Sequence, residues 1–197
     1  MITVSPDPVR VESELVGGLL SCPSCEVGVL GPWGWARERL VGRGGSGRRV
    51  VPRRSRCRWC RTTHVLLPAT MLLRRGEWAA TIGRAVELRA QGWGWRPIAA
   101  RLGLARSTVR GWLSRLVEVA ERVRSHVTRW AYWLDPGLVR IEPSSSVVGD
   151  VVAAVGAVGE AASRRGGSGG RWQFASAATG GRLLCNTTSP FPAPWTG

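Results

Sequence analysis

Apolar side chains change their spacing about one third of the way along this chain of 197 residues. Before residue 70, apolar and polar residues alternate or form short β-branched runs, which is the period of β-strands. From residue 74, apolar residues recur at intervals of three and four, which is the period of helices that bury one face. The pattern predicts an α+β chain, with a small β unit followed by an all-α unit.

The β unit is expected to be a hairpin with a glycine-rich loop. In residues 31–41, Trp33 and Trp35 share one phase of an alternating run, which predicts an exposed strand. The segment GRGGSG at 42–47 predicts a flexible turn. The β-branched run at 62–68 predicts the strand that closes the hairpin.

The all-α unit is expected to hold three helices. The first, in residues 76–92, ends at Gly92, which favours a C-terminal cap. Gly103 separates the second and third helices, because glycine tolerates the positive φ of a tight turn. The side chains expected to face the core are Trp78, Ile82, Ala85, Val86, Ile98, Ala99, Leu102, Val109, Trp112 and Leu113.

The chain beyond the third helix carries weaker signals. Residues 116–134 keep helical spacing, so they either extend the third helix or pack behind it, and they offer a surface for a homodimer. Residues 147–163 favour another helix, and RRGGSGG at 164–170 is typical of a flexible linker. The predicted divisions are an N-terminal extension (1–19), the β unit (20–70), the helical unit (74–134) and a C-terminal region of helix, linker and mostly disordered tail (135–197).

Charge is concentrated in the middle of the chain. Residues 31–130 carry 22 arginines against five glutamates, a net +17, out of a formal net charge of +15 for the whole chain. Such a segment indicates a polyanionic partner, and nucleic acid is the leading candidate. An anionic membrane surface is the competitor, but no basic amphipathic helix dominates the sequence.

The expected cellular location depends on membrane-spanning and export signals in the sequence. No run of about 18 apolar residues exists, so no membrane span is expected. The N-terminus is acidic and mixed, unlike a signal peptide, so we expect a cytoplasmic protein associated with the nucleoid.

Four cysteines form two Cys-x-x-Cys pairs, Cys22 with Cys25 and Cys57 with Cys60. Two such turns supply the four thiolates of a closed tetrahedral zinc site, so residues 20–70 are predicted to be a zinc ribbon. The alternatives are a redox pair and fortuitous cysteines. A thioredoxin-like pair needs a preceding strand and a following helix, which neither pair has.

Other residues near the second pair have two interpretations each. His64 is either a substitute ligand or a strand histidine without metal, and the second is favoured. Zinc with four thiolates carries a formal charge of −2, which neighbouring arginines are expected to offset. These arginines are Arg54, Arg56, Arg58 and Arg61.

Residues 95–116 resemble the helix-turn-helix of bacterial repressors and insertion-sequence transposases. That motif has a small residue, a glycine four positions later, a β-branched residue six later and a bulky apolar residue three after that. Here these are Ala99, Gly103, Val109 and Trp112. One departure is Ala105, which stands where a serine N-cap is common.

The resemblance implies that the third helix enters the major groove of DNA. Arg106 and Arg110 would then pair with guanine, and Arg96 with a phosphate. The residues expected to contact DNA are Arg96, Arg106, Ser107, Thr108, Arg110, Gly111 and Ser114. A merely structural three-helix unit is the alternative.

A zinc ribbon followed by a helix-turn-helix resembles the N-terminal half of several insertion-sequence transposases. The run RCRWCRTTHVLLP also resembles an uncharacterised zinc-ribbon family of short bacterial proteins from GC-rich genomes. The resemblance implies binding of double-stranded DNA, by a regulator or by a transposase-related protein, and it does not imply catalysis, so no enzyme is expected. The alternatives are a non-catalytic fragment or accessory subunit that works with a transposase or recombinase and, remotely, a redox or zinc-dependent enzyme.

Overall fold

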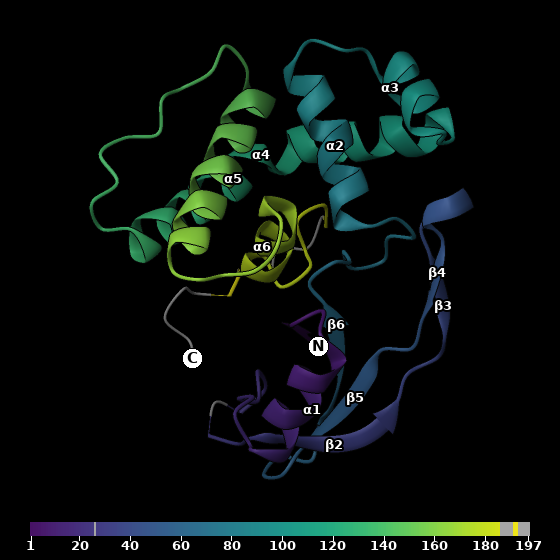
Figure 1. The fold of residues 1–197 in the computed structure, drawn as a ribbon, viewed down its shortest axis with the longest axis vertical. Coiled ribbons are helices and arrows are strands. Elements are labelled where there is room, and N and C mark those ends of the chain that lie inside the picture. Colours follow the sequence, from purple (N-terminus) through teal and green to yellow (C-terminus); the bar gives the residue numbers. More distant parts are fainter. Residues whose placement is uncertain (26, 186–190, 193–197) are drawn as a thin grey trace.

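The computed structural model describes residues 1–25, 27–185 and 191–192. A helical unit stands on a small sheet, and a two-stranded arm rises along one side of the sheet (Figure 1). The predicted α+β class, with a β unit followed by a helical unit, is confirmed.

The sheet contains four strands in the order β1-β6-β5-β2. Their bounds are β1 Ile2–Val4, β2 Leu30–Trp35, β5 Arg53–Cys57 and β6 Thr63–Pro68. Strand β5 pairs antiparallel with both β2 and β6, whereas β1 pairs parallel with β6. The strand predicted at residues 31–41 is divided, because only its first part lies in this sheet, whereas Arg39–Val41 pairs with Arg48–Val50 in a separate two-stranded sheet.

The first sixteen residues form part of this β unit, which the sequence division treated as an extension. Helix α1 (Pro8–Val16) begins with Asp7, whose carboxylate accepts a hydrogen bond from Val9 N at 3.0 Å. Proline at the first helical position suits the helix start. Val11 and Leu15 of α1 pack with Leu30 and Leu66 of the sheet.

A bulge in β2 separates the two tryptophans that were expected to share a face. Pro32 pairs with Ser55, but Trp35 pairs with Arg53, so β2 holds one extra residue. Gly34 absorbs the irregularity with a φ of 84°. Because an extra residue reverses the alternation of side chains, Trp33 and Trp35 point to opposite faces.

The glycine-rich turn is held against the helical unit. Strands β3 (Arg39–Val41) and β4 (Arg48–Val50) form an arm, joined by the short helix η1 (Gly44–Ser46). Gly42 N donates to Gly76 O at 2.8 Å, and Trp78 Nε1 donates to Ser46 O at 2.9 Å. These bonds tie the tip of the arm to the segment that enters the first helix of the helical unit.

Three helices follow at the predicted places. They are α2 (Ala79–Ala90), α3 (Trp95–Leu102) and α4 (Arg106–Leu134). Gly103 ends α3 in the left-handed region, with φ 64° and ψ 31°. The apolar side chains from residues 116–134 continue α4 without a break, so the extension alternative holds.

The C-terminal region completes the helical core. Helix α5 (Val147–Arg164) lies along α4, and α6 (Arg171–Ala178) contacts both α5 and α2. Leu183 and Leu184 are buried in the same core. The expectation of a mostly disordered tail is therefore wrong for residues 171–185, because their apolar side chains have a core to fill. The proline-rich end falls largely outside the described residues.

Packing of α6 depends on a glycine in α2. A Cβ atom at Gly83 would lie 2.2 Å from the Trp172 ring, so only glycine allows this approach. Trp172 Nε1 also donates to Glu87 Oε1 at 2.7 Å. No helix in the described part of the chain is long and apolar enough to cross a bilayer.

Candidate functional site

Two turns bring four cysteine sulfurs together at one end of the sheet. Cys22 and Cys25 precede β2, Cys57 ends β5, and Cys60 lies in the turn from β5 to β6. All four Sγ atoms lie within 4.8 Å of one another. Since Cys57 pairs with Leu30 of β2, the register of the sheet sets the two turns side by side.

The sulfur spacing fits a tetrahedral metal site. Cys22 Sγ lies 3.7 Å from Cys60 Sγ, and Cys25 Sγ lies 3.6 Å from Cys57 Sγ. A disulfide needs about 2.05 Å, so neither pair is bonded. Four zinc–sulfur bonds of about 2.3 Å in a tetrahedron place neighbouring sulfurs about 3.8 Å apart. The predicted clustering of the two Cys-x-x-Cys pairs is confirmed.

Backbone hydrogen bonds and burial act on these thiols in opposite directions. Ser24 N donates to Cys22 Sγ at 3.4 Å, and such bonds favour a thiolate. Burial raises the pKa of the Cys22 thiol to about 11, whereas hydrogen bonds from Thr62 lower the pKa of Cys60 to about 6. A divalent cation bound by all four sulfurs would favour the deprotonated form of each.

His64 lies beside the cysteine cluster. Its Nε2 atom is 3.6 Å from Cys22 Sγ, and its Nδ1 atom is 2.9 Å from the amino group of Met1. Burial, and then the charge of that amino group, lower the pKa of the imidazole. The sulfur cluster has four ligands without His64, which agrees with its interpretation as a strand histidine.

The arginines near the second cysteine pair do not all face the cluster, contrary to expectation. Successive residues of a strand point to opposite faces, so Arg54 and Arg56 lie on the face opposite to Cys57. Arg56 stacks over Trp33, with its guanidinium carbon 4.5 Å from the ring centroid. The charge of these two arginines therefore lies on the opposite side of the sheet from Cys57.

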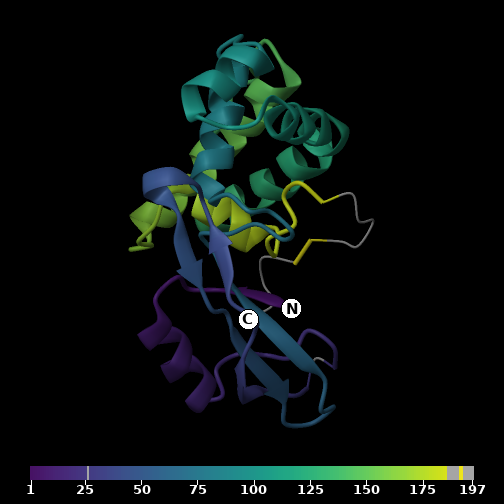
Figure 2. The ribbon, with the colours of Figure 1, turned by 90° about the vertical axis from the view of Figure 1, so that its right-hand side faces the viewer.

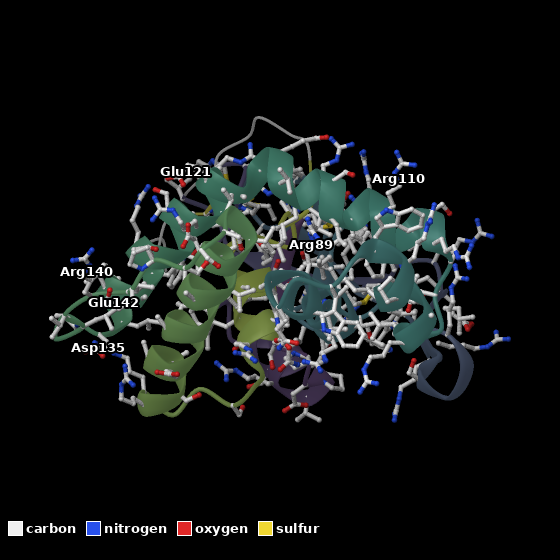
Figure 3. The ribbon with its side chains drawn as sticks, turned by 90° about the horizontal axis from the view of Figure 1, so that it is seen from above. Arg89, Arg110, Glu121, Asp135, Arg140 and Glu142 are labelled. Carbon is white, nitrogen blue, oxygen red and sulfur yellow. The ribbon has the colours of Figure 1, made fainter. Side chains whose placement is uncertain are left out.

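The helical unit holds the second candidate site. Val109 and Trp112 are buried and fix α4 against the core, as the motif predicted. Ala105 makes no side-chain cap, also as predicted. Figure 3 shows Arg110 at the outer edge of α4. Six of the seven candidate contact residues are exposed, and the seventh, Thr108, is half-buried; the exposed ones are Arg96, Arg106, Ser107, Arg110, Gly111 and Ser114.

A groove beside α4 adds a residue that the sequence did not single out. Its volume is about 330 Å³, and it lies between α2, α3 and α4. Arg89 lines this groove together with Arg110 and Ser114, and both arginines are labelled in Figure 3. Arg89 occupies the last turn of α2, where it is exposed. Its position just before the helix-turn-helix motif is the feature of the sequence that could have identified it. Trp95 also lines the groove, and the Arg96 guanidinium lies 5.0 Å from its ring centroid.

The fold and these two sites define a protein with a four-cysteine ribbon followed by a helix-turn-helix. Residues 80–120 match a family model described as a homeodomain-like domain, which covers α2, α3 and the first half of α4. No curated protein matches the chain, and no solved structure matches it. The family match indicates that DNA is a partner of the helical unit.

Proposed function

We propose that this protein binds double-stranded DNA sequence-specifically through α4, without catalysing a reaction, and that zinc holds its ribbon together. The observation that carries the proposal is the homeodomain-like match at residues 80–120, combined with an exposed basic face on the helix that the motif places in the major groove. No acidic side chain lies among the candidate contact residues, so this face attracts a polyanion.

The residues of α4 are assigned by their position on this face. Arg106 and Arg110 stand one turn apart at the N-terminal end of α4, where the motif meets base edges. Arginine pairs bidentately with O6 and N7 of guanine. Ser107 and Thr108 are placed for hydroxyl contacts. Arg96 and Arg89 flank the reading face and are assigned to phosphates, which position the protein without specifying sequence.

Zinc is assigned a structural role. Four cysteines close the coordination sphere and leave no position for a substrate, which is typical of structural sites. The ion would link the turn before β2 to the turn after β5 and so fix the sheet register. Binding of such an ion is coupled to folding. Elemental analysis of the purified protein should give one zinc ion per chain.

The biological setting is a finer proposal. The order of ribbon and helix-turn-helix favours a transposase-related or transcription-regulatory protein acting at the nucleoid in the cytoplasm. A fragment or accessory subunit that works with a transposase or recombinase is the second candidate. Two of the four carboxylates after residue 125 have close local partners, since Asp135 pairs with Arg164 at 2.6 Å and Asp150 accepts from Ser144 N at 2.6 Å. This supports a binding protein over a carboxylate enzyme.

Selection from a pool of random duplexes tests the proposal. Wild-type protein should enrich one short sequence. Arg110→Ala should weaken binding to it by about 1–3 kcal/mol and relax the preference at one base pair. Arg84→Ala removes an exposed arginine of α2 that pairs with Glu87 and serves as the control. Recovery of unselected sequence by the wild-type protein would refute sequence-specific binding.

A further inference from the structure

The two faces of the sheet carry opposite charge. Helix α1 covers one face and brings Asp7, Glu12 and Glu14, and the one arginine of the strands that turns toward it, Arg53, pairs with Glu12 at 2.8 Å. The other face carries Arg54 and Arg56 of β5 and has no acidic side chain from β5 or β6. The sheet therefore attracts a polyanion on one face only.

A third arginine and a tryptophan extend this basic face. The guanidinium of Arg58 lies beside Gly31, where a Cβ atom would be 3.2 Å from its Nε atom. Gly31 pairs with Arg56, so Arg58 lies on the same side of the sheet. Trp33 is 48 % exposed and carries the Arg56 guanidinium on its ring. We call Trp33, Arg54, Arg56 and Arg58 the open basic face.

The arginines of this face are available to a ligand. Among the described residues, no hydrogen bond or ion pair of the side chain joins Arg54 or Arg58 to a partner. Arg56 makes one bond, from its Nε atom to Arg61 O at 3.0 Å, which together with Trp33 holds it flat on the sheet. A guanidinium fixed in this way loses less side-chain entropy on binding than a free one.

The open basic face and the reading helix lie on the same side of the molecule. In Figure 2, the purple α1 lies to the left of the sheet, so the open basic face is turned to the right, where α4 lies in the helical unit above. Figure 3 agrees, since Arg110 lies at the edge of the view that is remote from α1. A straight polyanion along this side can therefore touch both surfaces.

We propose that the open basic face binds the phosphate backbone of the duplex that flanks the site contacted by α4. This inference rests on the proposed function, because it uses the position of α4 on DNA. Arginines two positions apart on a strand are separated by about 6.7 Å, so Arg54, Arg56 and Arg58 span about 13 Å. A duplex carries one charge per about 1.7 Å of its axis, counted over both strands, so a stretch of duplex of this length carries about eight phosphate charges in all. The contact is assigned to the phosphate backbone of the DNA. A flat strand face has no helix that could enter a groove and reach the base edges.

The inference predicts that DNA length matters on one side of the site. Affinity is measured for a duplex that ends at the selected site and for duplexes extended by about 20 bp, roughly two helical turns, on either end. Wild-type protein should bind one of the two extended duplexes more tightly than the short one. Its dependence on salt should also be steeper on that duplex, because more phosphates are neutralised.

Single-charge variants assign this effect to the open basic face. Arg58→Gln and Arg54→Gln should each lower the salt slope by about one on the favoured extended duplex and leave the short duplex unchanged. Arg10→Gln is the matched control, because it removes one exposed charge from α1 on the other face. The side chains of Arg54 and Arg58 make no described hydrogen bond or ion pair, so folding should be unaffected, which unfolding curves verify.

Three outcomes would overturn the inference. The first is equal affinity of the wild-type protein for the short and both extended duplexes. The second is an equal effect of Arg10→Gln, which would indicate bulk charge. The third is tighter binding when the flank is single-stranded, which would make Trp33 a base-stacking platform. Failure of the proposed function looks different, because it removes the preference for the selected site on the short duplex.

Discussion

Gly103 gives the sharpest test of the turn that positions α4. Its backbone has φ 64° and ψ 31°, and a Cβ atom added there would meet nothing within 4 Å. The cost of a substitution is therefore backbone strain alone, about 1–2 kcal/mol for alanine in the left-handed region. Valine should cost more, because β-branched residues resist positive φ, and asparagine should cost less.

Denaturant and thermal unfolding measure this series. For a chain of this size, 1 kcal/mol corresponds to about 2–4 °C in Tm. Gly111→Ala is the matched control, because Gly111 also has open space around its Cβ position but lies inside helix α4. It should stabilise the protein by about 0.5–1 kcal/mol. If Gly103→Ala proved as stable as the wild type, or the order of valine and asparagine were reversed, the left-handed turn would be refuted.

Three further predictions concern metal, acid and packing. Cys57→Ser should abolish binding of the one zinc ion per chain and unfold the sheet, seen by elemental analysis and circular dichroism; a metal-free variant with an intact sheet would contradict this. His126 is buried, and its pKa is lowered in the folded protein, chiefly by burial. As the pH drops, the unfolded chain therefore binds a proton at this histidine at a higher pH than the folded protein does, so stability should fall below about pH 6.5. The unfolding free energy of His126→Gln should depend less on pH between about 7 and about 5, and an unchanged dependence would count against the argument. Trp172→Ala should cost about 3–5 kcal/mol, since Trp172 is 5 % exposed, whereas Trp59→Ala, at a side chain 75 % exposed, should be nearly neutral in the same denaturant titration.

Local signals in the sequence were sufficient for the helical unit. Helical spacing predicted α2, α3 and α4, and Gly103 marked their turn because only glycine adopts that conformation without strain. The cysteine cluster was equally accessible, since a Cys-x-x-Cys pair aims two sulfurs at one point wherever its turn lies. Neither conclusion needed knowledge of distant contacts.

Long-range contacts explain what the sequence did not reveal. The pairing of β1 with β6 joins residues 2–4 to residues 66–68, and parallel pairing leaves no local pattern. Docking of α6 depends on Trp172 meeting Gly83, two residues far apart in the chain. The Asp7–Pro8 pair did carry a helix-start signal for α1, which the acidic composition of the N-terminus obscured.

The distribution of arginines was the least predictable part of the candidate sites. Residues 54 and 56 could be placed on a face only once the register of β5 was known, because a shift of one residue reverses every side chain. The bulge at Gly34 had the same consequence for Trp33 and Trp35. Net charge along the sequence therefore indicated a polyanion but not the side on which it binds.

The central claim, that α4 reads bases with its arginines, is tested most directly by a coupling measurement. Each guanine of the selected site is replaced in turn by 7-deazaguanine, which lacks the N7 acceptor, and the affinities of wild type, Arg106→Ala and Arg110→Ala are compared. At least one guanine should lose its sensitivity to this replacement in one of the variants, with a coupling free energy of about 1 kcal/mol or more. If the effects of base and residue add independently for every guanine and both arginines, α4 does not read the sequence through Arg106 or Arg110.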